Sequence, residues 1–63
     1  DQIRGCYQEV MELPAKYRVP LYLYYYEGYR VQEIGELLGL NASTVQTRLA
    51  RAREKLKTQL EEV

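Results

Sequence analysis

The sequence predicts a small all-α fold of four helices. Apolar residues recur at helical spacing along most of the chain, and prolines and glycines separate the periodic segments. The chain has 63 residues, enough for one domain of marginal stability, since a domain this small buries only about 60% of the surface that its unfolded chain exposes. We expect one domain over residues 1–63. Because the chain starts at Asp1, without an initiating Met, we expect it to be a fragment of a longer protein.

The first helix is expected over residues 3–13 and should end before Pro14, because proline disfavours helical backbone in the residue before it. Its inward residues are expected to be Ile3, Cys6 or Tyr7, Val10 and Leu13. The second helix is expected within residues 15–28. Pro20 lacks a backbone donor, so this helix should either begin late, near Arg18, or bend at Pro20. We expect Leu23 and Tyr26 to face inward, with Leu21 or Tyr22 beside them.

Gly28 suits the left-handed turn that ends the second helix. The third helix is expected over residues 31–39, ending at Gly39. Its apolar face is predicted to consist of Val31, Ile34, Leu37 and Leu38. Asn41 is a favourable N-cap for the fourth helix, the longest and most regular of the four. A single apolar stripe follows that helix: Val45, Leu49, Ala52, Leu56 and Leu60.

The third and fourth helices have the spacing of a helix-turn-helix, which we place at about residues 30–57. Gly39 stands at the tight turn, and Gly35 stands where the two helices should approach closely. The inward side chains are expected to be Ile34, Leu38, Leu40 and Val45. In DNA-binding proteins of this kind, the second helix enters the major groove.

Charge is unevenly distributed along a chain whose net charge is zero. Residues 1–40 hold four basic and six acidic residues, whereas residues 41–63 hold five basic and three acidic residues. A local basic patch bears on the choice of partner even in a neutral chain. Taken alone, these charges fit a solvated helix face, since Arg and Lys near a helix C-terminus complement its dipole.

On the fourth helix, the residues opposite the apolar stripe are Ser43, Thr47, Ala50 and Glu54, flanked by Gln46 on one side and by Thr44 and Arg51 on the other. Small residues permit close approach to DNA, Gln and Arg bridge base edges, and Thr contacts a thymine methyl group. The free N–H groups at the helix N-terminus favour a phosphate. Together with the helix-turn-helix spacing, this face predicts DNA binding.

Other kinds of site find little support. With no His and a single cysteine, Cys6, a zinc site of the usual type cannot be assembled, and we expect no cofactor and no enzymatic activity. No apolar run approaches the length of a membrane span, and a reducing, cytoplasmic setting fits the cysteine content. Six of the seven tyrosines lie between Tyr17 and Tyr29. They are expected mainly to pack helices, although an exposed group of them would suit protein docking.

Three segments, "LPAKYR", "YYEG" with "EIGELLGL", and "STVQTRLARAREKL", resemble region 4 of sigma-70 family sigma factors, and especially the extracytoplasmic-function (ECF) group. The resemblance covers roughly residues 13–57. It implies a small four-helix, winged-helix-like domain that binds the promoter −35 element while docked on the β flap of RNA polymerase. It also implies masking by an anti-sigma factor.

Residue roles follow from the same resemblance. The base-facing residues would be Ser43, Thr44, Gln46, Thr47 and Arg51. The phosphate-facing residues would be Arg30, Gln32, Asn41 and Arg48. Arg30 stands where the family often has a hydroxyl residue, and a cation at a helix N-terminus opposes the helix dipole, so we expect a DNA phosphate to offset it.

Two other functions compete with promoter binding. One is DNA binding by another helix-turn-helix regulator, such as the response-regulator type, which usually works as a dimer on paired half-sites. The other is a protein-interaction module whose arginines meet an acidic partner. Salt-dependent DNA binding would distinguish the two DNA-binding functions from the protein-interaction module. Binding to the polymerase flap would distinguish the sigma-factor function from another helix-turn-helix regulator.

Overall fold

A computed structural model describes residues 4–61, apart from the side chains of Arg4, Leu60 and Glu61. A short 3-10 turn, η1 (Arg4–Cys6), leads into α1 (Tyr7–Met11), and three further helices follow: α2 (Ala15–Tyr25), α3 (Val31–Leu38) and α4 (Ala42–Glu61). The described part of the chain contains no strand, so the predicted all-α, four-helix fold is confirmed. No helix within that part is long and apolar enough to cross a membrane.

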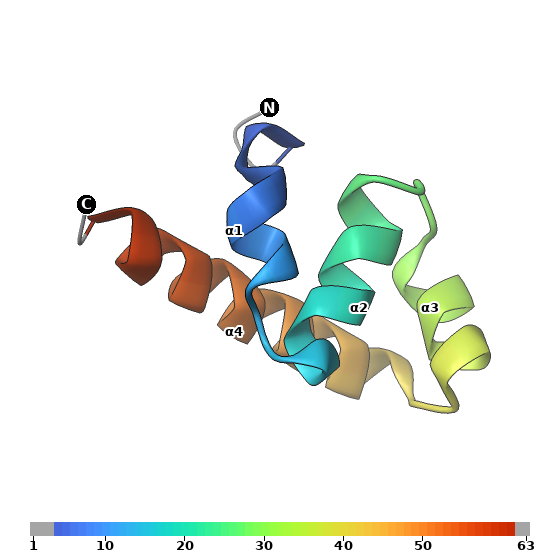
Figure 1. Ribbon diagram of the computed structural model, residues 1–63. Helices are drawn as coiled ribbons and strands as arrows, with labels where there is room; N and C mark the ends of the chain where they lie inside the picture. Colours follow the sequence, from blue (N-terminus) through green and yellow to red (C-terminus); the bar gives the residue numbers. More distant parts are fainter. Residues whose placement is uncertain (1–3, 62–63) are drawn as a thin grey trace.

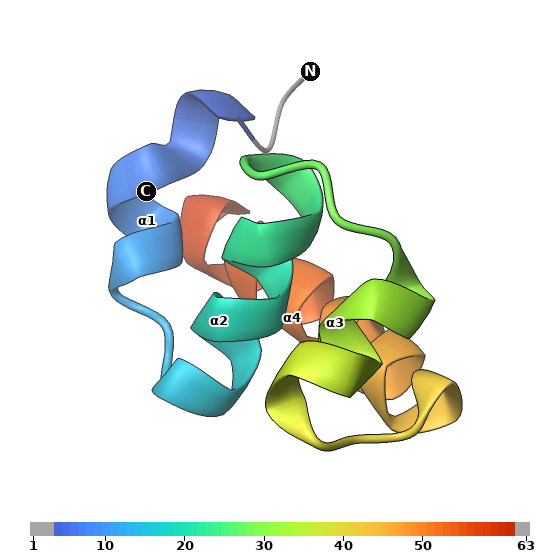
Figure 2. The same cartoon turned by 90° about the vertical axis from the view of Figure 1, so that its right-hand side faces the viewer.

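The helix α4 runs along the lower side of the molecule, and α1 and α2 stand above it (Figures 1 and 2). With 20 residues it is about 30 Å long at 1.5 Å per residue, which accounts for most of the 35 Å long axis. The helix α2 is central, since it packs against α1, α3 and α4. This arrangement leaves one long face of α4 open to solvent.

The first helix is shorter than expected. Its first turn is a 3-10 turn, and the α-helical part ends at Met11, two residues before Leu13. The predicted inward residue Ile3 lies outside the described residues. Arg18 caps the end of α1, because its guanidinium donates to the carbonyl oxygens of Met11 at 3.4 Å and Leu13 at 3.5 Å. A cation in this position complements the negative end of the helix dipole.

The expected late start of the second helix near Arg18 is wrong. The helix α2 begins at Ala15, because the carbonyl oxygen of Pro14 accepts hydrogen bonds from the N–H groups of Tyr17 and Arg18, both at 2.9 Å. Pro20 is the sixth residue of the helix and is buried. Its missing N–H leaves out one intrahelical bond, to the carbonyl of Lys16 near the solvent-exposed start of the helix.

The inward face of α2 also differs from the expectation. Leu21 is fully buried, whereas Leu23 and Tyr26, expected to face the core, are half-buried at its edge. Gly28 adopts the predicted left-handed conformation, with φ of 80°. The chain then turns so that the N–H of Tyr29 donates to the carbonyl of Leu23 at 3.0 Å.

The helix-turn-helix forms as predicted from α3 and α4. Glu33 accepts a hydrogen bond from the backbone N–H of Arg30 at 2.8 Å, which satisfies one free donor at the start of α3. Gly39 ends α3 with φ of 71°. Gly35 lies close to the turn itself, since a Cβ atom there would be 2.5 Å from the carbonyl oxygen of Leu40. The glycine therefore lets the turn fold back onto α3.

One residue of the predicted α3 face is not inward. Leu37 is 59% exposed, whereas Ile34 is fully buried. Successive helical residues are rotated by ~100°, so Leu37 lies about 60° to one side of Ile34, while Val31 and Leu38 lie about 60° and 40° to the other. The neighbouring helices cover the side of Val31 and Leu38, which are half-buried. Leu37 falls beyond the edge of the contact.

All four helices contribute to one apolar core. The predicted stripe of α4 is buried as far as its side chains are described: Val45, Leu49, Ala52 and Leu56. The other buried members are Val10, Leu13, Leu21 and Ile34. No buried side-chain nitrogen or oxygen atom among the described residues lacks a hydrogen-bond partner. The core thus fixes the rotation of α4 about its axis, and with it the residues that face solvent.

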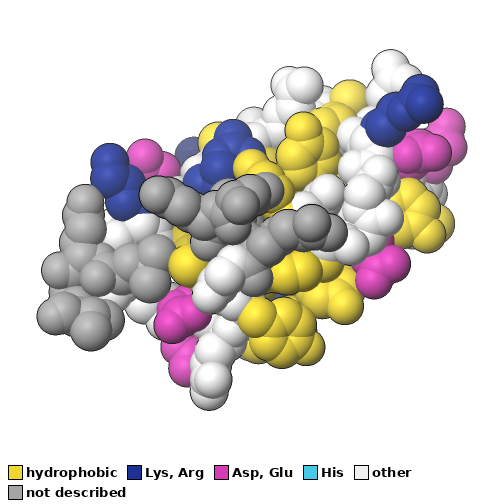
Figure 3. Space-filling view, turned by 90° about the horizontal axis from the view of Figure 1, so that it is seen from above, with side chains coloured by type: hydrophobic (Ala, Val, Ile, Leu, Met, Phe, Trp, Pro, Cys, Tyr) yellow, Lys and Arg dark blue, Asp and Glu magenta, His cyan; other side chains and the backbone are white. Residues whose placement is uncertain are grey.

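Three tyrosines form an aromatic cluster on the α1 and α2 side of the molecule: Tyr7, Tyr22 and Tyr26. Tyr22 stacks on Tyr26 with ring centroids 5.2 Å apart, and Tyr7 meets Tyr26 edge-on at 5.8 Å. Seen from above, hydrophobic side chains reach the surface in several places, with acidic side chains near some of them (Figure 3). Tyr7 is 54% exposed, so the tyrosines both pack the helices and reach solvent.

Candidate nucleic-acid interface

The start of α4 is organised by Asn41, the predicted N-cap. Its side-chain oxygen accepts hydrogen bonds from the backbone N–H of Thr44 at 2.9 Å and from the hydroxyl of Ser43 at 3.0 Å. The cap satisfies one of the free donors of the first turn and fixes where the helix begins. Its amide nitrogen has no hydrogen-bond partner among the described residues and is available to donate to an anion.

The exposed face of α4 has the composition expected from the sequence. Ser43, Thr47 and Ala50 are exposed opposite the buried stripe, and Gln46 and Arg51 are exposed on its flanks. Thr44 and Arg48 are half-buried. Over residues 42–53 this helix holds no acidic residue, and its first carboxylate, Glu54, comes in the fourth turn. The N-terminal half of the face is thus small, polar and positively charged.

Two hydroxyl groups on this face already donate to the protein. Thr47 donates to the backbone carbonyl of Ser43 at 3.0 Å, and Ser43 donates to Asn41. Their oxygens keep free lone pairs toward solvent, and a threonine methyl group stands beside its hydroxyl. In this conformation the two side chains offer acceptors and an apolar contact to an approaching surface, rather than donors.

A hollow opens where α4 meets the first turn of α2. It has a volume of 370 Å³ and is lined by Lys16, Tyr17, Ser43, Thr44, Thr47, Arg48 and Arg51. The structure therefore brings together five predicted site residues, all on α4. Asn41, Gln46, Arg30 and Gln32 do not line it. Arg30 and Gln32 are exposed at the start of α3, and Arg30 precedes the first residue of that helix.

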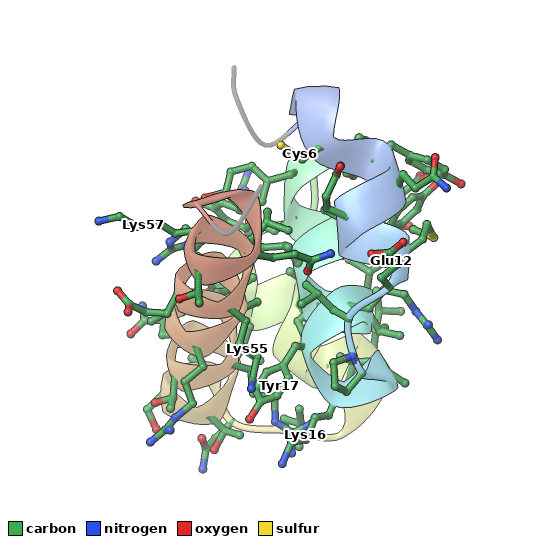
Figure 4. All side chains as sticks on the ribbon, turned by 60° about the vertical axis from the view of Figure 1, so that its left-hand side comes forward. Cys6, Glu12, Lys16, Tyr17, Lys55 and Lys57 are labelled. Atoms are coloured by element: carbon green, nitrogen blue, oxygen red, sulfur yellow. The ribbon has the colours of Figure 1, made fainter. Side chains whose placement is uncertain are left out.

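Two lysines lie beside Tyr17, whose side chain lines this hollow, and neither lysine is among the predicted site residues. The ammonium nitrogen of Lys16 lies 5.2 Å from the ring centroid of Tyr17, and that of Lys55 lies 5.3 Å from it. Figure 4 shows Tyr17 between the two lysines, which come from α2 and α4. Both distances are within the range of a cation–π contact.

The sequence gives only a weak indication of Lys16 and Tyr17 as site residues. They lie in the half of the chain with a net negative charge, 27 and 26 residues before Ser43 on the exposed face of α4. The only signal is a cation in the first turn of a helix, where it opposes the dipole. Arg30 has a similar placement at the start of α3, and the sequence analysis did predict it as a site residue.

The described residues hold no cluster of His, Cys, Asp or Glu side chains able to bind a metal ion. The chemistry available on the α4 face is hydrogen bonding and positive charge. Such a surface suits recognition of a polyanion, with side chains of α4 at its centre and cations at its margin.

Comparison with known proteins agrees with this geometry. The family model described as "Sigma-70, region 4" matches residues 7–56. The chain is 41% identical over 56 residues to the Bacillus subtilis "ECF RNA polymerase sigma factor SigW", covering 89% of the chain. It is 41% identical over 49 residues to "RNA polymerase sigma factor SigV" of the same organism, covering 78% of the chain. The chain spans only 30% of the length of each relative.

Proposed function

The chain belongs to the sigma-70 region 4 family, and on this premise we propose that it binds double-stranded promoter DNA at the −35 element as one domain of an ECF sigma factor. Residues 1–63 would form this domain, with the helix-turn-helix at about 30–57, within a longer protein that directs RNA polymerase to start transcription in the cytoplasm. We assign the chain a binding role and no catalytic step.

The observation that carries this proposal is the exposed face of α4. Its rotation is fixed by four buried side chains, so the small, hydroxyl-bearing and basic residues face outward together. A major groove about 12 Å wide admits an α-helix. Within the family, a helix-turn-helix presents this second helix to the groove.

Each predicted side chain has a chemical role in this proposal. Arg51 and Gln46 reach base edges, where bidentate hydrogen bonds distinguish one base pair from another. Ser43, Thr44 and Thr47 contact bases through hydroxyl oxygens or methyl groups. Contacts to phosphates fix the register without reading sequence. We assign that role to Arg30, Gln32, Asn41 and Arg48.

Protein partners belong to a different surface. An apolar groove of 290 Å³ lies between α1 and α2, lined by Tyr7, Met11, Arg18, Val19, Tyr22 and Leu23. It shares no residue with the hollow beside α4. Aromatic residues, Met and Arg are enriched at protein interfaces. We propose that this groove docks the β flap of RNA polymerase, and that an anti-sigma factor masks the domain.

DNA binding can be tested by recording amide shifts of the labelled chain by NMR during titration with a duplex. One duplex carries a −35-like element and the other a scrambled sequence, each at two salt concentrations. We expect shifts centred on residues 43–51, larger for the −35-like duplex and weaker at high salt, because phosphate contacts release counterions. NMR suits this test because a single small module binds weakly.

An absence of shifts at low salt would contradict the proposal and point to a protein-interaction module instead. Equal shifts with both duplexes would retain DNA binding but remove promoter reading.

A further inference from the structure

The hollow between α2 and α4 has one wall that does not belong to α4. Three of its lining side chains are cations, Lys16, Arg48 and Arg51, and none is acidic. Like charges gathered around one hollow repel each other, and a bound anion relieves that repulsion. The hydroxyl of Thr44, which also lines the hollow, adds a group of the kind that donates to phosphate oxygens in protein–DNA complexes.

Tyr17 is part of the wall of the hollow that α2 forms. It is half-buried and packs against the core, so its ring is a fixed platform. Lys16, one of the three lining cations, lies 5.2 Å from the ring centroid, and Lys55 of α4 lies 5.3 Å from it, so one further charge stands beside the ring that lines the hollow (Figure 4). Lys16 and Lys55 remain exposed, so both ammonium groups are accessible.

The start of α2 strengthens the positive potential there. Its first turn holds no acidic residue, and its N-cap, Pro14, makes no side-chain hydrogen bond to the helix. The positive end of the helix dipole therefore lies beside Lys16 without a compensating carboxylate in that turn. Lysine is unfavourable in this position for the isolated helix, and an external anion would offset the cost.

We propose that Lys16 contacts a DNA phosphate, with Lys55 beside it, so that the backbone of one strand lies along the α2 side of α4. This inference rests on the proposed DNA binding and extends it to a second helix. The occupant we assign is a run of backbone phosphates, because the hollow is continuous with the exposed face of α4 through Thr47 and Arg51. Lysine meets phosphate as a point charge, so this contact adds affinity and no sequence preference.

The test compares Lys16→Gln and Lys16→Arg with the parent chain. Lys57→Gln is the matched control, since Lys57 is exposed on α4 but does not line the hollow. Dissociation constants are measured for the −35-like and scrambled duplexes over a series of salt concentrations. For Lys16→Gln we expect the plot of log K against log salt to be shallower by about 0.9, the value for one lost phosphate contact.

The loss of affinity in Lys16→Gln should be the same factor on both duplexes. Lys16→Arg should keep the parent slope, and so should Lys57→Gln. An unchanged slope in Lys16→Gln, with salt-dependent binding by the parent, would overturn this inference and leave the proposed function intact. The occupant of the hollow would then be an acidic protein segment. Unequal loss on the two duplexes would overturn the phosphate role. Failure of the parent to bind either duplex would overturn both proposals.

Discussion

At the scale of single residues, Asn41 illustrates how one side chain can serve both folding and binding. Its oxygen caps α4 through Thr44 and Ser43, while its amide nitrogen has no partner within the part of the chain that the structure describes. The two functions therefore belong to different atoms. Substitutions that keep one and remove the other can separate them.

We predict that Asn41→Ala lowers the free energy of unfolding by about 1 kcal/mol, because the helix loses its cap. Asn41→Ser should keep most of the stability, since serine also caps helices well, but should lose any phosphate contact made by the amide. Urea denaturation and DNA titration of both variants provide the measurement. Equal DNA affinity in Asn41→Ser and the parent would remove Asn41 from the phosphate-binding residues.

Among the residues that we propose to read bases, Arg51 allows the most specific test. It is exposed on the flank of α4 and lines the hollow, and its guanidinium can bridge two acceptors on one base. We predict that Arg51→Ala costs roughly 1–3 kcal/mol of binding free energy on the −35-like duplex. The ratio of the affinities for the −35-like and scrambled duplexes should therefore decrease. Competition binding with both duplexes measures this. An equal loss on the two would reassign Arg51 to a phosphate.

At the scale of elements, α3 shows that the apolar residues of one short helix can differ widely in burial. Ile34 is buried against the rest of the core, while Leu37 points to solvent. Both are large aliphatic residues within one turn of each other. Their difference arises from the neighbours of α3 and not from the helix itself.

We predict that Ile34→Ala destabilises the chain by about 2–5 kcal/mol, because it leaves a cavity in the core. Leu37→Ala should change stability by no more than about 0.5 kcal/mol, as expected for an exposed site. Thermal or urea denaturation of the two variants makes a matched comparison. A large loss in Leu37→Ala would mean that Leu37 packs inward after all.

At the scale of the whole molecule, two surfaces of opposite character lie on different elements. The basic hollow and polar face belong to α4 and the start of α2, and the apolar groove belongs to α1 and the rest of α2. The single core between them holds both in a fixed relation. On the proposed function, this arrangement would let the domain bind DNA and a protein partner at the same time.

We predict that substitutions separate the two activities. Thr47→Glu places a negative charge on the exposed face of α4 and should abolish DNA binding while leaving binding to the polymerase flap intact. Tyr7→Ala removes a 54% exposed ring from the apolar groove and should weaken flap binding without changing DNA affinity. Circular dichroism checks that both variants fold. If either variant loses both activities while remaining folded, the two surfaces are not independent.

Local physics explains the features that were predicted correctly. The stripe of α4, the cap at Asn41 and the left-handed glycines Gly28 and Gly39 all depend on residues a few positions apart. The residue roles assigned on α4 stay predictions, although four of the residues are exposed: Ser43, Gln46, Thr47 and Arg51. The all-α class and the helix-turn-helix follow from the same short-range signals.

The features that could not be predicted from the sequence depend on how the helices pack against each other. Periodicity identifies the residues that share a face of one helix, but not how much of that face its neighbours cover. Leu37 is therefore exposed, and on α2 Leu21 is fully buried while Leu23 is only half-buried against the core. Proline chemistry left open a late start of α2 near Arg18 or a bend at Pro20, and the late start is wrong, because the N–H groups of Tyr17 and Arg18 already donate to the carbonyl of Pro14.

The sequence by itself therefore determined the number and order of the helices, the cap at Asn41 and the outward residues of α4, because these depend on contacts within a turn or two. Only the tertiary structure decided that Lys16 and Tyr17 stand beside Arg48 and Arg51, since packing of α2 on α4 brings together residues more than 30 positions apart. No local pattern encodes that contact, which arises from the core that all four helices share.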